Sequence, residues 1–173
     1  MNEKDENGNY PLLKAIIDNN IEIVQLLVEY ANQHQIVLEL NEKNNVAEYP
    51  ILKAIHKNNI EIVKLLIAYA NQHLIILELN EKDENGNYPI LWVTSNNNVE
   101  MVQLLMEYVN QHQVILELNE KNRYKNYPLC LAICKDNIKM VKLIIEYANQ
   151  HQICFGIECK KCFRILSTFR SYL

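Results

Sequence analysis

A period of 39 residues runs through most of this chain. Tyr-Pro and two apolar residues begin at Tyr10, Tyr49, Tyr88 and Tyr127, and Tyr-(Ala/Val)-Asn-Gln-His begins at Tyr30, Tyr69, Tyr108 and Tyr147. Four near-copies therefore follow one another, at residues 2–40, 41–79, 80–118 and 119–157. A fixed period of roughly 20 to 50 residues is typical of a solenoid, in which each copy buries its apolar face only against its neighbours.

Each copy has the pattern of two helices. In the first copy, Pro11 occupies a place that the first turn of a helix tolerates, and apolar residues follow at helical spacing in 12–16. The pair Asn19-Asn20 ends this short helix, because Asn is the best non-glycine residue for the left-handed conformation that closes helices. A longer amphipathic helix is predicted next, ending between Tyr30 and His34.

The end of each copy is predicted to be an extended segment and a loop. Residues 36–40 are largely apolar, with β-branched residues at their start. The Asn-Glu-Lys that opens the next copy begins a stretch rich in turn formers. We therefore expect an extended segment that leads into a hairpin-like loop.

Residues 5–28 resemble the ankyrin-repeat pattern. That pattern has Asp and Gly, then Thr-Pro-Leu-His, Ala-Ala, Gly-His, and Glu-Ile-Val with two leucines. Here Asp5 and Gly8 precede Tyr-Pro-Leu-Leu, and Glu22-Ile-Val is followed by two leucines. The resemblance covers about nine-tenths of the chain. It implies an all-α fold, an ankyrin-like α-solenoid of helix-turn-helix repeats with long inter-repeat loops or short hairpins.

The departures from the family pattern are the same in every copy. Tyr replaces Thr before the proline, and Asn replaces the Gly between the helices, with Asp136 at that place in the last copy. The family His is replaced at Leu13, Leu52, Leu91 and Cys130. The hydrogen bond that the Thr and His make in the family is therefore unavailable here. The period also exceeds the usual 33 residues or so, and we place the insertion at Asn32–Val37 and its equivalents, where it lengthens the second helix and enlarges the loop.

Invariant apolar positions in the second helix are expected to form the core. They are Val24, Val63, Val102 and Val141, with Leu26, Leu65, Leu104 and Leu143. We expect Leu65 and Leu104 in particular to lie in the interior, between neighbouring copies.

Composition favours a folded protein of the cytoplasm. With 49% hydrophobic and 22% charged residues the chain can bury a core. No run reaches the roughly 18 apolar residues that a membrane helix requires, and the polar, acidic start is unlike a signal peptide. All five cysteines lie in the last 44 residues, a distribution that indicates reduced thiols rather than a disulfide scaffold.

Charge is unevenly distributed along the chain. Residues 2–40 carry 2 basic and 7 acidic groups, whereas residues 119–157 carry 6 basic and 3 acidic groups. The first 118 residues total −10 and the last 55 total +6. Drift on a solvated surface accounts for such a split, and so does a polarised partner site.

Four histidines occupy one repeat position, at His34, His73, His112 and His151. Stacking separates them by about one layer, roughly 10 Å, which is too far to share an ion at the ~2 Å His–Zn distance. A place near a helix C-terminus suits them, because the dipole and the unpaired carbonyls favour histidine there. We therefore interpret them as structural.

The carboxyl-terminal cysteines are a candidate zinc site. His151, Cys154, Cys159 and Cys162 provide soft ligands within 12 residues. Their spacing matches no familiar zinc module, and the repeat itself explains His151. No glycine-rich phosphate loop or serine nucleophile motif is present either. The sequence therefore predicts no metal, no cofactor, no small-molecule substrate and no catalytic residue.

Residues 158–173 are predicted to form a basic amphipathic tail or capping helix. Its apolar residues, such as Phe163, Leu166 and Phe169, recur at steps of three and four. We expect them to cover the end of the stack near Val141 and Ile145, as terminal repeats must. A membrane-surface or partner-helix role is the alternative.

In ankyrin-type stacks the partner usually meets the loop tips and the exposed side of the first helix, along a concave face. Those positions vary most among the four copies, while the core stays fixed. Trp92, the only tryptophan, stands where other copies have Lys or Leu, and such aromatics are enriched among interface anchors. The candidate partner-binding residues are Glu6, Asn7, Asp18, Glu48, His56, Lys57, Glu84, Trp92, Ser95, Asn96, Arg123, Tyr124 and Lys135.

The sequence thus favours a protein–protein interaction module without catalysis. One alternative is a non-binding structural fragment of a longer array. Another is weak binding to an anionic surface through the basic carboxyl end. The acidic body argues against a general nucleic-acid protein.

Overall fold

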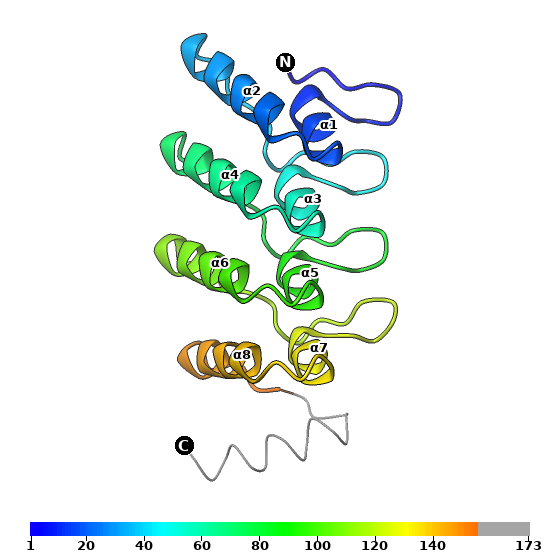
Figure 1. Ribbon diagram of the computed structural model, residues 1–173, viewed down its shortest axis with the longest axis vertical. Coiled ribbons are helices and arrows are strands. Elements are labelled where there is room, and N and C mark those ends of the chain that lie inside the picture. The colour runs from blue at the N-terminus through cyan, green and yellow to red at the C-terminus, as the bar shows by residue number, and fades with distance from the viewer. Residues whose placement is uncertain (156–173) are drawn as a thin grey trace. The chain divides into compact units, whose positions relative to one another are not determined.

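The computed structural model describes residues 1–155, and within them it contains eight helices and no strand (Figure 1). The predicted tail and Cys159 and Cys162 lie outside these residues. No helix in the described part is long and apolar enough to cross a membrane. The helices are α1 (Pro11–Ile17), α2 (Ile21–Gln33), α3 (Pro50–His56), α4 (Ile60–Gln72), α5 (Pro89–Ser95), α6 (Val99–His112), α7 (Pro128–Cys134) and α8 (Ile138–Gln150).

The chain divides into two compact bodies, with the boundary inside α5, between Trp92 and Val93. In the N-terminal body α1 lies beside α3 and α2 lies beside α4, with hairpin loops projecting beyond α1 and α3 (Figure 1). In the C-terminal body α7 packs on α8, and α8 lies beside α6. The all-α repeat fold expected from the sequence is therefore confirmed.

The turn between the two helices of a copy is built by two consecutive residues with different tasks. Asn19 takes the left-handed conformation, with φ 54°, as its sequence predicted. The side chain of Asn20 then caps α2 by accepting from the Ile23 amide at 3.0 Å. Sequence reading missed this capping role. The same pair of conformations recurs at Asn58-Asn59, Asn97-Asn98 and Asp136-Asn137.

An aspartate or asparagine closes each hairpin loop. In the first loop Asp5 Oδ1 accepts from the amides of Asn7 and Asn9, both at 2.9 Å, and the Asp5 amide donates to the Asn9 carbonyl at 2.8 Å. The amides of Asn9 and Asn7 hold the pKa of Asp5 below its ordinary value, although burial opposes them. Asn44, Asp83 and Asn122 make the equivalent contacts.

The tyrosine before the proline makes a hydrogen bond that was not predicted from the sequence. Its ring is buried at Tyr10 and Tyr49. The Tyr10 hydroxyl donates to the Glu42 carbonyl at 3.1 Å, and the Tyr49 hydroxyl donates to the Glu81 carbonyl at 2.9 Å. Burial, first of all, raises the pKa of both phenols, so they stay protonated donors. In the N-terminal body, tyrosine therefore joins the first loop to the second and the second loop to the third.

The predicted site of the insertion spans the end of the second helix and the segment that follows it. The second helix extends through Gln33, and Gln35 follows in the left-handed conformation with φ 56°. Residues 36–40 then run on without regular secondary structure, and they bury Leu38 and Leu40.

One core prediction was wrong. Leu65 and Leu104 are only half-buried, whereas the next residues, Leu66 and Leu105, are fully buried. Both leucines of each adjacent pair fit the apolar face of an amphipathic helix, and the rotation of the helix about its axis places the second leucine inward. Val63 and Val102 are buried as predicted.

We expect Leu66→Ala to lower the free energy of unfolding by about 2–5 kcal/mol, because it removes fully buried methyl groups from α4. Leu65→Ala is the matched control and should cost clearly less. Urea unfolding of both variants measures the difference. Equal losses would contradict the face assigned to α4.

A second prediction concerns the loop positions in the left-handed conformation. Ala47→Gly should raise the free energy of unfolding by about 0.5–1 kcal/mol, because relief of the left-handed penalty at φ 57° exceeds the added chain entropy. Gly8→Ala should instead destabilise by more than about 1 kcal/mol. At Gly8 the φ is +76°, and an added Cβ would lie 2.6 Å from Asn45 Oδ1 and 3.0 Å from the Asn45 amide nitrogen. Thermal melts of the two variants should therefore shift in opposite directions.

Candidate binding surface

Several predicted site residues of the N-terminal body lie exposed on its loops and at the ends of its first helices. Glu6 and Asn7 lie in the first hairpin loop, and Glu84 lies in the third. Asp18 caps the end of α1, while His56 and Lys57 occupy the end of α3. Exposure at these places is compatible with contact to a partner.

Glu48 is engaged within its own loop. Its carboxylate pairs with Lys53 of α3 and accepts from Asn44 Nδ2 at 3.3 Å. Lys53 and Glu48 are both largely covered. Glu48 therefore fastens the second loop to α3, in addition to any contact with a partner.

Trp92 stands in α5 between two side chains of the same body. Its ring stacks on His56, with centroids 4.2 Å apart and planes inclined by 21°. Its indole Nε1–H donates to Asp83 Oδ2 at 3.3 Å, while Asp83 Oδ1 also accepts two loop amides. Trp92 is half-buried. The arrangement fixes the orientation of a large aromatic side chain that remains accessible to a ligand.

The position of Trp92 contacts the hairpin loop of its own copy in the first two copies as well, but there the contact is an ion pair. Lys14 of α1 lies 4.0 Å from the Asp5 carboxylate, and Lys53 pairs with Glu48. Trp92 and Asp83 replace the ion pair by a hydrogen bond. Sequence reading missed Asp83, although an acidic residue nine positions before Trp92, as Asp5 is before Lys14, was a usable signal.

The C-terminal body carries the remaining predicted residues. Arg123 and Tyr124 lie exposed in its hairpin loop, where Tyr124 is 71% exposed. Lys135 is exposed at the end of α7, and Ser95 and Asn96 are half-buried at the end of α5. The structure thus places the predicted residues on loops and first-helix ends in both bodies, each considered by itself.

The four repeated histidines lie at the ends of the second helices, as predicted. His34, His73 and His151 are C-cap residues, and His112 is the last residue of α6. Each ring also packs on the tyrosine four residues earlier, with centroids 4.1–4.3 Å apart. This ring contact was not foreseen from the sequence.

No cluster of three or more potential metal ligands occurs among residues 1–155. Cys130, Cys134 and Cys154 form no disulfide there. The zinc interpretation rested on Cys154 together with two cysteines beyond the described residues, so the described part neither assembles nor tests that site.

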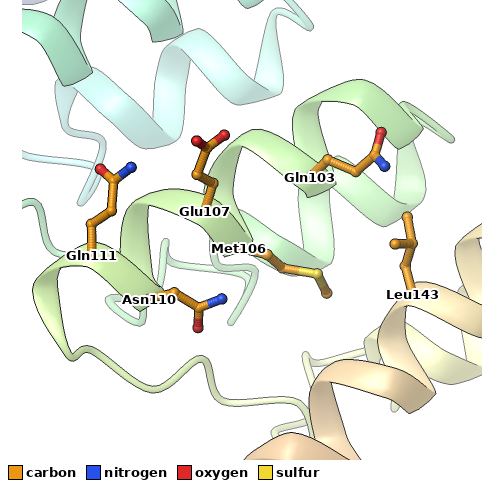
Figure 2. A pocket seen from close by; sticks show the side chains of 6 residues that line it. All are labelled: Gln103, Met106, Glu107, Asn110, Gln111 and Leu143. Carbon is orange, nitrogen blue, oxygen red and sulfur yellow. The ribbon is translucent and has the colours of Figure 1, made fainter.

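A groove of about 520 Å³ lies between α6 and α8 in the C-terminal body (Figure 2). It is lined by Gln103, Met106, Glu107, Asn110 and Gln111 of α6 and by Leu143 of α8. This groove was not predicted, because it belongs to the second helices, whereas sequence variation pointed to the first helices and the loops.

The His56–Trp92 stack predicts a pH-dependent signal. Burial lowers the pKa of His56 below 6.5, Lys53 and Lys57 act in the same direction, and Glu48 and Asp83 oppose them. Because the folded chain then binds fewer protons than the unfolded chain, this contribution to stability is present above pH 6.5 and is lost as the pH falls toward the lowered pKa.

An imidazolium quenches a stacked indole, so Trp92 fluorescence should fall with a midpoint below pH 6.5. His56→Gln should abolish the transition. A midpoint above 6.5, or a transition that survives the substitution, would contradict the stacked geometry.

Comparison with known proteins agrees with the geometry of the helix pairs. The family model described as ankyrin repeats (3 copies) matches residues 1–75 and again residues 70–154. Among curated proteins, none matches the sequence closely enough to count as a relative. Ankyrin repeats are generally protein–protein interaction modules and are typically non-catalytic. With two matches that together span residues 1–154, this chain belongs to the ankyrin-repeat family.

Proposed function

We propose that this chain binds a protein partner through the face formed by its first helices and hairpin loops, and that it has no catalytic role. The observation that carries the proposal is the half-buried Trp92, whose orientation is fixed by His56 and Asp83. Tryptophan is enriched among the few residues that dominate binding energy at interfaces. A side chain that is already ordered also loses less entropy on binding.

Charged and polar side chains surround this anchor and supply specificity. His56 and Lys57 lie at the end of α3, and Glu84 lies in the loop that carries Asp83. Rim charges of this kind change association rates and partner choice more than affinity. The partner expected is a folded or extended protein segment with an apolar side chain to pack on Trp92 and polar groups around it.

A cytoplasmic location fits this role. Cys130, Cys134 and Cys154 form no disulfide among the described residues, as suits a reducing compartment. Two alternatives compete with partner binding: a purely structural part of a longer array, and weak binding of an anionic surface through the basic carboxyl end.

Partner capture from a cell lysate tests the proposal, with Trp92→Leu as the decisive variant. Leucine occupies the equivalent position at Leu131, so the helix should tolerate it. We expect the affinity for the captured partner to fall at least about tenfold, as loss of an aromatic anchor does. Gln25→Ala, an exposed change on α2, is the control and should keep the partner.

A combined variant at Asp18, His56, Lys57, Trp92 and Lys135 extends the test to the whole face. Full retention of the partners by this variant, with unchanged helicity by circular dichroism, would remove the proposed face. Capture of vesicles of anionic lipid in place of a protein would favour the anionic-surface alternative.

A further inference from the structure

Three side-chain contacts join α4 to the copy before it, and three equivalent contacts join α8 to the copy before it. The first uses a tyrosine hydroxyl. In the N-terminal body the Tyr69 hydroxyl donates to the Ile36 carbonyl at 3.0 Å and accepts from the Leu38 amide at 3.1 Å. In the C-terminal body the Tyr147 hydroxyl accepts from the Leu116 amide at 3.1 Å. Both contacts to the amide span 31 residues. The register between neighbouring copies is therefore the same in both bodies.

The other two contacts use an asparagine and a histidine. Asparagine Nδ2 donates to an Oδ1 40 residues earlier, and histidine Nε2 contacts an Oδ1 41 residues earlier. The pairs are Asn59–Asn19 at 2.9 Å, Asn137–Asn97 at 2.7 Å, His73–Asn32 at 2.8 Å and His151–Asn110 at 3.2 Å.

The first copy carries the same three groups, Asn20, Tyr30 and His34, beside an apolar face that is exposed on α2. Ile23 is 45% exposed, Leu26 is 63% exposed and Tyr30 is 48% exposed. The equivalents of Ile23 in the other copies are fully buried, and Tyr69 and Tyr147 are 2% exposed. We call Ile23, Leu26 and Tyr30 with Asn20 and His34 the N-face.

The last copy carries the backbone and side-chain groups that, in earlier copies, form these three contacts with the next copy. They are the Ile153 carbonyl and Phe155 amide for a tyrosine, Asp136 for an asparagine and Asn149 for a histidine. Within residues 1–155 no hydrogen bond engages these two backbone groups or these two side chains. We call this set the C-face.

Charge also favours the pairing of these two faces. The first copy, residues 2–40, has 7 acidic and 2 basic groups, and the last copy, residues 119–157, has 3 acidic and 6 basic groups. Two N-faces brought together would repel each other, whereas an N-face and a C-face attract.

We propose that the chain self-associates head to tail, with the N-face of one molecule on the C-face of another. Tyr30 then bonds the Ile153–Phe155 segment, Asn20 donates to Asp136, and His34 contacts Asn149. The contact is heterologous, so a pair of molecules retains one free N-face and one free C-face, to which further molecules can add. This association uses the second helices and is independent of the first-helix surface proposed above. It competes with the packing predicted for the tail of residues 158–173 near Val141 and Ile145, which a monomeric parent chain would favour.

The groove between α6 and α8 identifies the residues of α8 whose substitution should disrupt the C-face. Leu143, which lines it from α8, is the equivalent of Leu26, and Gln103 and Asn110, which line it from α6, are the equivalents of Lys142 and Asn149. Lys142 and Asn149 are exposed, so substitutions there leave the core untouched.

Sedimentation velocity of the full chain from micromolar to millimolar concentration tests the proposal. An N-face variant, Ile23→Lys with Leu26→Lys, and a C-face variant, Lys142→Glu with Asn149→Glu, should each associate at least about tenfold more weakly than the parent. An equimolar mixture of the two should form a heterodimer, because each partner contributes one intact face. High salt should weaken the parent's association, since opposite charges are screened.

Three results would overturn the proposal, given circular dichroism that shows unchanged helicity for all variants. The first is a parent chain that stays monomeric throughout. The second is a C-face variant that associates as strongly as the parent, which indicates a symmetric contact between two α2 helices. The third is a mixture that yields no complex.

Discussion

The hydroxyl of the buried tyrosine in the second helix is the contact on which the arrangement of neighbouring copies depends. A helix pair of this size cannot bury its own apolar face, and the connecting segment between copies leaves backbone amides and carbonyls without helical partners. Tyr69 adds a buried ring to the apolar contact between copies. Its hydroxyl forms hydrogen bonds with the Ile36 carbonyl and the Leu38 amide of the connecting segment. An unpaired backbone group at such a place costs about 1–3 kcal/mol.

In the hairpin loops, too, side chains form hydrogen bonds with backbone groups that have no partner in a helix. Asp5 and its equivalents satisfy the amides inside each loop, and Tyr10 and Tyr49 reach the carbonyls of the next loop. Ion pairs between loops, such as Lys4–Glu42, add little because both partners are exposed. A loop that is ordered in this way keeps its variable tip residues in fixed positions. This order also positions Asp83 to hold Trp92.

The two sides of a helix pair carry different properties. The first helices and loops bear the side chains that vary among copies, with Trp92 and His56 in contact. The second helices bear invariant residues, and the exposed apolar residues of α2 and the groove between α6 and α8 belong to them. Partner binding and self-association, as proposed, therefore use separate surfaces and can be disrupted separately.

The sequence by itself determined the repeat, the helix pairs, the left-handed turns at Asn19 and its equivalents, and the family, because these follow from local periodicity and from the conformational preferences of single residues. It did not determine which of two adjacent leucines faces inward, since Leu65 and Leu66 both fit an apolar stripe and only the packed helix decides its rotation. The pairing of Trp92 with His56 and Asp83 also required the tertiary structure. His56 lies 36 residues before Trp92, and only the packing of neighbouring copies brings side chains so far apart in the chain within stacking distance.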